Sequence, residues 1–203
     1  MPKEIEIKFR ITDIKALIRA LKSTGFEQVT RSTHEINSLY DLPGQNLRKR
    51  GELLRLRKYG KQWVLTHKKK STLARKARKD GAPDAGRHKV RTELETRVEN
   101  GEQMDAVLRA LGFSPTFRYE KYRAEWSDGT AHAVIDETPI GNFGELEGPA
   151  RWIDRTARAL GITPRDYLTQ TYADLFFTWK RKNRSPASEM TFSAIPAKYR
   201  DAR

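Results

Sequence analysis

The chain has 203 residues, with 40 Lys or Arg against 26 Asp or Glu, so its formal charge is +14 and its pI is about 10.1. With 37% hydrophobic residues, a chain of this length can bury a core, which excludes disorder throughout. It contains no Cys, which excludes disulfides, thiolate metal sites and cysteine nucleophiles.

The beginning of the chain is charged. Its first eight residues include four charged side chains, where a signal peptide needs an apolar run. No stretch of the sequence approaches the ~20 apolar residues that cross a membrane. We therefore expect a soluble, cytoplasmic protein without a membrane partner.

The basic excess is concentrated in two segments. Residues 68–89 have a surplus of seven positive charges and residues 179–203 a surplus of five, so together they carry twelve of the fourteen. A basic pI suggests nucleic-acid binding, but the rest of the chain is close to balance. A nucleic acid is therefore not the expected partner. A non-catalytic module that binds RNA or polyphosphate through the two basic segments stays open as an alternative.

The first half of the chain predicts strands and one helix. Residues 3–11 alternate charged and apolar side chains, as a half-buried β-strand does. Apolar residues then recur at helical spacing from Ile14, and Gly25 marks the end of that helix. The later elements expected here are an extended stretch, two strands of a hairpin and a basic loop: 26–41, 52–58 with 61–67, and 68–88.

The second half predicts one strand, one helix, three more strands and a helical region in two parts: 89–98, 101–111, 115–126, 131–137, 143–148, and 151–160 followed by a helix from Thr163. No period of 20 to 50 residues repeats, which excludes a solenoid or propeller. The fold class is α+β, dominated by an antiparallel sheet. The predicted domains are a folded unit of residues 1–179 and a basic, disordered tail of residues 180–203.

The polar faces of these strands are charged. Alternation places Glu4, Glu6 and Lys8 on one face of the first strand, and Arg55 with Arg57 on one face of another. Two arrangements fit this pattern: an open sheet whose charged face meets water, or a closed barrel whose charged faces point inward. Because a buried ionised group is costly unless it is paired or metal-bound, a charged interior makes sense only as a wet site for a charged ligand.

The mixture of charges indicates which ligand would suit such an interior. The carboxylates of Glu-x-Glu pairs, about 7 Å apart along a strand, suit hard divalent cations such as Mg²⁺ or Mn²⁺. Clustered Arg and Lys side chains suit phosphate oxygens. Both together predict a metal-polyphosphate ligand, since metal ions and basic side chains jointly neutralise charge in phosphoryl transfer.

Short motifs recur in order over about residues 3–177. They are Glu4-Ile5-Glu6-Ile7-Lys8, Leu39-Tyr40-Asp41, Leu54-Arg55-Leu56-Arg57, Leu65-Thr66-His67-Lys68, Arg91-Thr92-Glu93-Leu94-Glu95, Glu120-Lys121-Tyr122-Arg123, Ile135-Asp136-Glu137, Gly144-Glu145-Leu146-Glu147 and Thr171-Tyr172-Ala173-Asp174-Leu175. In this order they resemble the CYTH superfamily, the triphosphate tunnel enzymes that include class IV adenylyl cyclases and thiamine triphosphatases. The resemblance implies a closed eight-stranded antiparallel β-barrel with flanking helices, whose charged interior is a tunnel open at both ends.

The resemblance also implies roles for individual residues. Those that match the metal-binding acids are Glu4, Glu6, Asp136, Glu145 and Glu147, with Glu93 and Glu95 as weaker matches. Those that match the basic residues holding the triphosphate are Lys8, Arg55, Arg57, Lys68, Arg91, Lys121 and Arg123. Tyr40 matches a tyrosine that the thiamine triphosphatases pair with the lysine matched by Lys68, which implies catalytic roles for both. Lys68 would lower the pKa of Tyr40 or protonate the leaving group, although Lys69 and Lys70 compete for its place in the tunnel.

The implied activity is that of a Mg²⁺- or Mn²⁺-dependent enzyme acting on a triphosphate substrate. Chain length and the last Glu-x-Glu motif look closest to the class IV adenylyl cyclases, which convert ATP to cyclic AMP and pyrophosphate. Hydrolysis of tripolyphosphate, thiamine triphosphate or a nucleoside triphosphate is the alternative. Because some relatives dimerise, a homodimer is one expected state.

Overall fold

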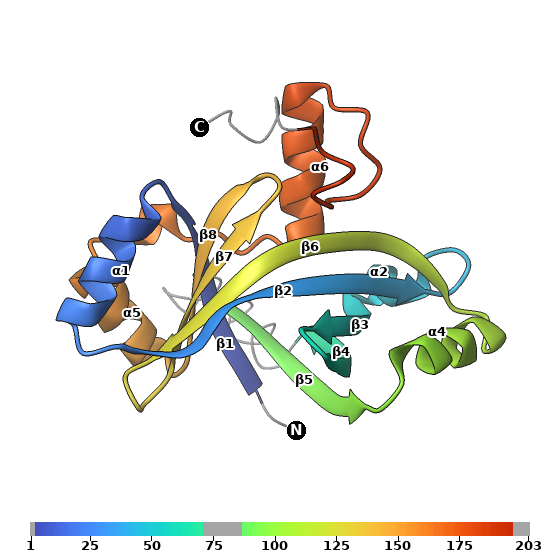
Figure 1. The fold of residues 1–203 in the computed structure, drawn as a ribbon, viewed down its shortest axis with the longest axis horizontal. Coiled ribbons are helices and arrows are strands. Elements are labelled where there is room, and N and C mark those ends of the chain that lie inside the picture. Colours follow the sequence, from blue (N-terminus) through green and yellow to red (C-terminus); the bar gives the residue numbers. More distant parts are fainter. Residues whose placement is uncertain (1–2, 71–86, 197–203) are drawn as a thin grey trace, which may run out of the picture.

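A computed structural model describes residues 3–70 and 87–196 (Figure 1). Within these residues, eight strands close into an antiparallel barrel in the order β1-β5-β4-β3-β2-β6-β7-β8. The strands are β1 (Lys3–Ile11), β2 (Glu27–Asp41), β3 (Glu52–Tyr59), β4 (Gln62–Lys70), β5 (Lys89–Val98), β6 (Ser114–Ser127), β7 (His132–Thr138) and β8 (Gly141–Glu147). The predicted α+β barrel is therefore confirmed, and the alternative of an open sheet is excluded.

The helices lie outside the barrel. They are α1 (Ile14–Ser23), α2 (Asn46–Arg50), α4 (Gly101–Ala110), α5 (Ala150–Ala159) and α6 (Tyr172–Asn183), with a short 3-10 helix η1 (Pro164–Asp166). Figure 1 shows α1 and α5 together on one side, α4 on the opposite side, and α6 standing over β6 and β8. No helix among the described residues is long and apolar enough to cross a membrane.

Strand register places the charged face of β1 inside the barrel. Lys8 lies opposite Glu145 of β8, while Glu6 lies opposite Glu147 on one side and Lys89 of β5 on the other. Directly opposed residues of antiparallel strands project to the same face. The alternation of β1 therefore carries over to its neighbours, and the charged side chains converge on the interior.

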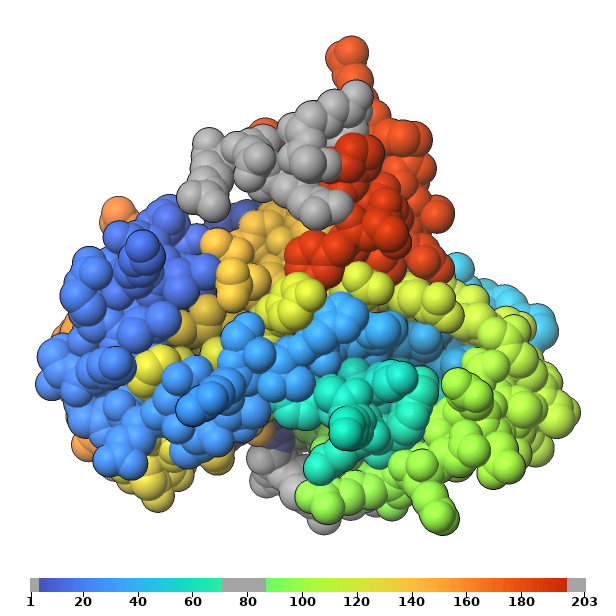
Figure 2. Space-filling model, in the orientation of Figure 1, coloured from blue at the N-terminus to red at the C-terminus, as the bar shows by residue number. Residues whose placement is uncertain are grey.

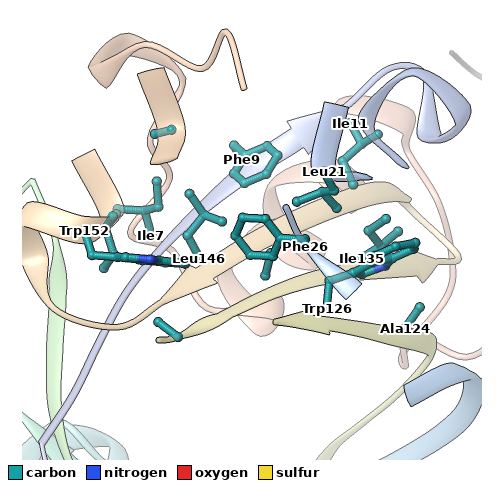
Figure 3. Packing of buried hydrophobic residues seen from close by; sticks show 14 residues of the cluster. Ile7, Phe9, Ile11, Leu21, Phe26, Ala124, Trp126, Ile135, Leu146 and Trp152 are labelled. Carbon is teal, nitrogen blue, oxygen red and sulfur yellow. The ribbon is translucent and has the colours of Figure 1, made fainter. Parts of the chain in front are cut away.

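The apolar face of β1 forms the main core, between the barrel and the pair α1 and α5 (Figure 3). Ile7 and Phe9 of β1 pack there with Leu146 of β8 and Trp152 of α5. Gly144 of β8 lies opposite Phe9, and a Cβ at this position would collide with the Phe9 ring. Only glycine, which has no side chain, leaves room for the Phe9 ring over the backbone of β8.

Two smaller apolar clusters lie elsewhere on the outer surface of the barrel. Under α4, Leu108 packs against Tyr40 and Leu56 of β2 and β3. Under α6, Phe176 packs with Phe117 of β6 and with the chain that follows the helix. These parts of the outer face are thus apolar and covered by helices, whereas Leu94 of β5 and Tyr122 of β6 are exposed.

Local capping explains two elements that differ from expectation. The sequence analysis expected no element between residues 41 and 52, but α2 forms there because the buried Asp41 carboxylate accepts the backbone N–H groups of Leu47 and Arg48. The helix expected from Thr163 is only η1, and the longer α6 begins at Tyr172. There Thr171 and Asp174 form a capping box, which fixes the start of the helix.

The basic loop expected over residues 68–88 begins later than predicted. Strand β4 continues to Lys70, so residues 68–70 are strand rather than loop. Residues 71–86 of the expected loop lie outside the described residues.

The tail differs from the expected disordered segment up to residue 196. Strand β7 pairs only with residues 122–127 of β6, which leaves the edge of β6 free at residues 118–120. Met190 takes this edge: its N–H donates to Arg118 and its carbonyl accepts from Glu120. Met190 and Ile195 are fully buried, and Figure 2 shows this segment in red against β6. Covering an exposed strand edge is the physical reason for this packing. Residues 197–203 of the tail lie outside the described residues.

Candidate active site in the barrel

The barrel encloses a cavity of ≈480 Å³ whose walls carry charges of both signs. Of the residues expected from the sequence, those that line it are Glu4, Glu6, Lys8, Arg55, Arg57, Lys68, Arg91, Glu93, Glu95, Lys121, Arg123, Glu145 and Glu147. The sequence analysis missed Lys89, Tyr119, Glu125, Thr171 and Tyr172, which line it too. Of the three successive lysines, Lys68 is the one in this wall. The structure therefore brings together residues that lie more than 140 positions apart in the chain.

The β1 wall is a set of ion pairs. Lys8 is buried and donates to Glu145, and Lys89 donates to Glu6. Burial disfavours the charged form of Lys8, but Glu145 and Glu6 outweigh it and raise the pKa of Lys8. Burial also opposes the charge of Glu6, yet Lys89 and Lys8 keep the pKa of Glu6 below its usual value. The two shifts thus favour the charged forms of Lys8 and Glu6.

A second group of pairs connects β1 with β4 and β5. The Lys68 ammonium lies 2.6 Å from a Glu4 oxygen and 3.0 Å from a Glu93 oxygen. The Arg55 guanidinium lies 3.9 Å from Glu93 and 3.8 Å from Glu95. These two distances exceed hydrogen-bond range, and the guanidinium donates instead to the Thr66 hydroxyl at 3.2 Å.

Asp136 lies behind the cavity wall and is fully buried. It accepts hydrogen bonds from Lys121 at 3.0 Å, from Arg123 at 2.7 and 2.6 Å, and from the Tyr172 hydroxyl at 2.6 Å. Arg123 also donates to Glu145 at 2.5 Å. Both oxygens of Asp136 are thus occupied, so its contacts are those of an anion that orients two cations rather than those of an open metal ligand.

Glu35 of β2 is a site residue that the sequence analysis did not identify. Its carboxylate is fully buried, accepts from the Asn37 amide at 2.8 Å, and lies 3.4 Å from Lys121, 3.5 Å from Arg57 and 3.9 Å from Arg123. Burial alone would raise its pKa, but Lys121, Arg57 and Arg123 dominate and hold the pKa of Glu35 far below its usual range. The alternation of Glu35 and Asn37 is the sequence signal that could have identified this face.

Tyr172 closes the gap where β1 separates from β5. The register of β1 with β5 ends at Glu6, and the backbone of Lys8 pairs instead with Leu168. This connection brings the first turn of α6 to the cavity. The Tyr172 ring centre lies 4.1 Å from the Lys8 ammonium and 5.0 Å from that of Lys121, so the helix supplies an aromatic surface for two tunnel cations.

The carboxylates at the mouth of the cavity are poorly compensated. Glu147 is exposed to the cavity, and partial burial together with Glu4, Glu6 and Glu145 raises its pKa to about 7. Burial and the neighbouring Glu6 also raise the pKa of Glu4. A divalent cation would relieve this repulsion, and oxygen donors of this kind are the ligands that Mg²⁺ and Mn²⁺ prefer. As the side chains stand, no three Asp, Glu or His among residues 3–70 and 87–196 are grouped closely enough to hold a metal. A cation would therefore have to exchange with Lys68 and Lys89.

Tyr40 is not brought to the tunnel, contrary to its expected catalytic role. It lies on the outer face of β2, opposite Leu54, and its hydroxyl donates to Asp105 of α4. Burial and Asp105 raise the pKa of Tyr40 to about 12. The parity of the strand explains the difference, because Tyr40 projects away from the face that carries Glu35 and Asn37.

Sequence comparisons agree with the geometry. A family model described as CYTH domain matches residues 2–159. A Methanocaldococcus jannaschii protein named as a candidate adenylate cyclase, MJ0240, is 27% identical over 183 residues, covering 85% of this chain and 97% of the relative. The adenylate cyclase CyaB of Aeromonas hydrophila is 25% identical over 148 residues, covering 70% of this chain and 67% of the relative.

Solved structures share the barrel at lower identity. The PH1012 protein of Pyrococcus horikoshii matches with a TM-score of 0.69 and 22% identity, covering 85% of this chain and 98% of that one. HpAC1 of Hippeastrum, described as a candidate adenylyl cyclase with a dominant triphosphatase activity, matches with a TM-score of 0.56 and 18% identity, covering 86% and 95%. The ordered motifs, the closed barrel with its charged interior and the family match together show that the chain belongs to the CYTH domain family.

Proposed function

We propose that this protein binds a triphosphate and divalent cations together in the tunnel and converts ATP to cyclic AMP and pyrophosphate, as a class IV adenylyl cyclase does. The observation that carries the proposal is the charge balance of the cavity. Eight basic and seven acidic side chains line it, and the buried Glu35 and Asp136 lie behind the wall. A triphosphate alone would therefore bring uncompensated negative charge into a partly buried site, so it needs accompanying cations.

The basic residues would bind phosphate oxygens. Arg55 and Arg57 of β3 face the cavity beside Lys121 and Arg123 of β6, and each makes contacts that a phosphate could replace. Asp136, expected from the sequence to bind metal, is proposed instead to orient Lys121 and Arg123. This assignment follows from its saturated hydrogen bonds.

The acidic residues proposed to hold Mg²⁺ or Mn²⁺ are Glu4, Glu6 and Glu147. Glu145, expected from the sequence to bind metal, accepts from Lys8 and Arg123 on its two oxygens and, like Asp136, is proposed instead to orient cations. Such an ion, when bound, neutralises phosphate charge and orients the reacting groups. Lys68 lies beside Glu4 and is proposed to neutralise the charge that develops on the leaving group.

The bond changes of the proposed reaction are simple. The 3′-oxygen of ATP forms a bond to the α-phosphorus, and the bond from that phosphorus to the oxygen bridging it to the β-phosphorus breaks. The 3′-hydroxyl gives its proton to solvent, and pyrophosphate departs with the electron pair of the broken bond. Arg and Lys side chains around the phosphates would stabilise the charge on that leaving group.

Hydrolysis of a triphosphate is the second candidate. It uses the same constellation, with water attacking the terminal phosphorus in place of the 3′-oxygen. It is favoured by the reported activity of HpAC1, whose fold this chain shares.

Product identification tests both candidates. Purified protein is incubated with ATP or tripolyphosphate and Mg²⁺ or Mn²⁺; cyclic AMP with pyrophosphate supports cyclisation, and orthophosphate supports hydrolysis. Glu147→Gln should lower kcat/KM on the order of 100-fold, whereas Glu27→Gln, an equal charge change at the exposed start of β2, should not. The absence of every product would refute both candidates.

A further inference from the structure

Tyr119 of β6 places a phenol hydroxyl in the tunnel wall. Alternation along β6 directs its side chain to the same face as Lys121 and Arg123. The residue is buried, and its ring packs against those of Phe117 and Tyr172, with 5.9 and 5.6 Å between ring centres. Because this packing fixes the orientation of the ring, the hydroxyl has a defined position among the tunnel cations.

The charges around this hydroxyl are mainly positive. It is hydrogen-bonded to the Arg55 guanidinium of β3, and Lys121 and Arg57 are further cations that act on it. The main opposing charge is the Glu35 carboxylate of β2. Burial alone would raise the pKa of Tyr119, but Arg55 and Lys121 outweigh it and lower the pKa from its usual value of 10.0.

Other tyrosines of the described residues have the opposite environment. Tyr40 and Tyr167 donate to carboxylates outside the tunnel, and burial together with these carboxylates raises the pKa of each to about 12. Tyr172 of α6 donates to the buried Asp136, and burial with this carboxylate raises its pKa as well, so it adds no charge beside Tyr119. Tyr119 differs because its partner is a guanidinium, which favours the phenolate.

The proposed reaction requires a group that takes a proton from the attacking hydroxyl. Although burial opposes their charge, neighbouring cations hold the pKa values of Glu35 and Glu145 far below the usual range, so both are weak bases. Glu4 and Glu147 are assigned to the metal. No histidine among the described residues lines the cavity. The phenol of Tyr119 is a proton acceptor that these assignments leave available.

Phosphate binding would increase the basicity of this group. In the free tunnel, Arg55 and Lys121 favour loss of the phenol proton. A bound phosphate offsets their charge, which raises the pKa of Tyr119 at the moment when the attacking oxygen lies beside the phosphorus. A general base is most effective when its pKa is near the operating pH, so the cations that bind the substrate also adjust the base.

We propose that Tyr119 is the general base of the reaction: its phenolate oxygen accepts the proton of the attacking hydroxyl, which is the 3′-hydroxyl of ATP in cyclisation or a water molecule in hydrolysis. The inference rests on the proposed function. As the proton moves to Tyr119, the attacking oxygen bonds to phosphorus, and the leaving group departs with the electron pair of the broken P–O bond. Tyr119 then releases the proton to solvent, which restores the phenolate.

Tyr119→Phe removes the hydroxyl and keeps the ring, and thermal unfolding verifies that the variant is folded. With saturating Mn²⁺, kcat should fall about 100-fold, whereas KM should stay within about threefold because the cations that bind the substrate remain. Ultraviolet absorption of tyrosinate gives a readout without substrate. The most acidic tyrosine of the wild type should be missing in Tyr119→Phe, and tripolyphosphate should shift its titration to higher pH in the wild type.

A ring-fluorinated tyrosine in place of Tyr119 tests the proton transfer itself. Fluorine lowers the pKa of the phenol, so the acid limb of the pH profile of kcat should move to lower pH. A merely structural role would leave this limb in place, and an unmoved limb would overturn the proposal.

The matched control is Tyr167→Phe, the same chemical change at a tyrosine whose hydroxyl lies 3.3 Å from Asp154, outside the tunnel. It should keep kcat and the most acidic tyrosine. Equal losses of kcat in both variants, or a folded Tyr119→Phe with unchanged kcat, would overturn the role of Tyr119. If the wild type forms no product, the proposed function itself fails, whereas product formation that does not depend on Tyr119 refutes only the inference.

Discussion

Replacing Asp136 by Asn should destabilise the fold without any ligand present. The carboxylate is fully buried and accepts from Lys121, Arg123 and Tyr172. An amide keeps the volume of the side chain but removes the charge that these two buried cations face, and its NH₂ group can only donate. Breaking a buried charge pair in this way costs ~3–5 kcal/mol, which corresponds to a fall in Tm of roughly 10 °C for a chain of about 200 residues.

Urea and thermal unfolding, followed by circular dichroism in metal-free buffer, measure this loss. The matched control is Asp105→Asn on α4, where the carboxylate pairs with an exposed Arg109 at 2.7 Å. An exposed pair of this kind is worth less than about 1 kcal/mol. If Asp136→Asn were as stable as the wild type without metal, and lost only its response to Mn²⁺, Asp136 would be a metal ligand as first expected and the orienting role would be wrong.

Three further outcomes are expected. The pKa of Glu147 is raised from 4.5 to about 7 in the folded protein, so the metal-free protein should lose stability as the pH rises from about 4.5 to 7. Urea denaturation across this pH range should show the loss in the wild type but not in Glu147→Gln, and an equal pH dependence of both proteins would contradict the raised pKa. Tyr40→Phe should leave turnover within about twofold and cost about 1 kcal/mol, the net value of its hydrogen bond to Asp105; a 100-fold loss of kcat would restore Tyr40 to the catalytic residues. Gly144→Ala should cost ~1–3 kcal/mol, because the new methyl group overpacks the Phe9 ring; unchanged Tm would show that the ring moves freely.

Strand alternation predicted much of the tunnel wall. In β1, the period of two separates Glu4, Glu6 and Lys8 from the apolar side, and each of these three lines the cavity. The motif resemblance placed Tyr40 in the site, but its side chain projects to the outer face of β2. The direction of this side chain depends on how β2 pairs with its neighbours, including a register irregularity at Leu39 and Tyr40, and a sequence motif does not contain this information.

The packed part of the tail shows a different limit of sequence reading. Its composition between residues 180 and 196 is polar and basic, which is typical of disorder. Met190 is nevertheless fully buried, because the short β7 leaves an edge of β6 uncovered. Only the pairing of the strands shows that this edge of β6 is free. The sequence of residues 180–196 therefore does not indicate that the segment packs against β6.

By itself the sequence determined which strand faces are charged and that carboxylates and cations alternate along the chain, because these properties are local and have a period of two. Closure of the barrel decided the rest. Bringing β1 beside both β5 and β8 turned the charged faces inward, saturated Asp136, and added Glu35 and Tyr172 to the site. The +14 charge is a sum over residues, whereas the pairing of each charge depends on distances that only the tertiary fold sets.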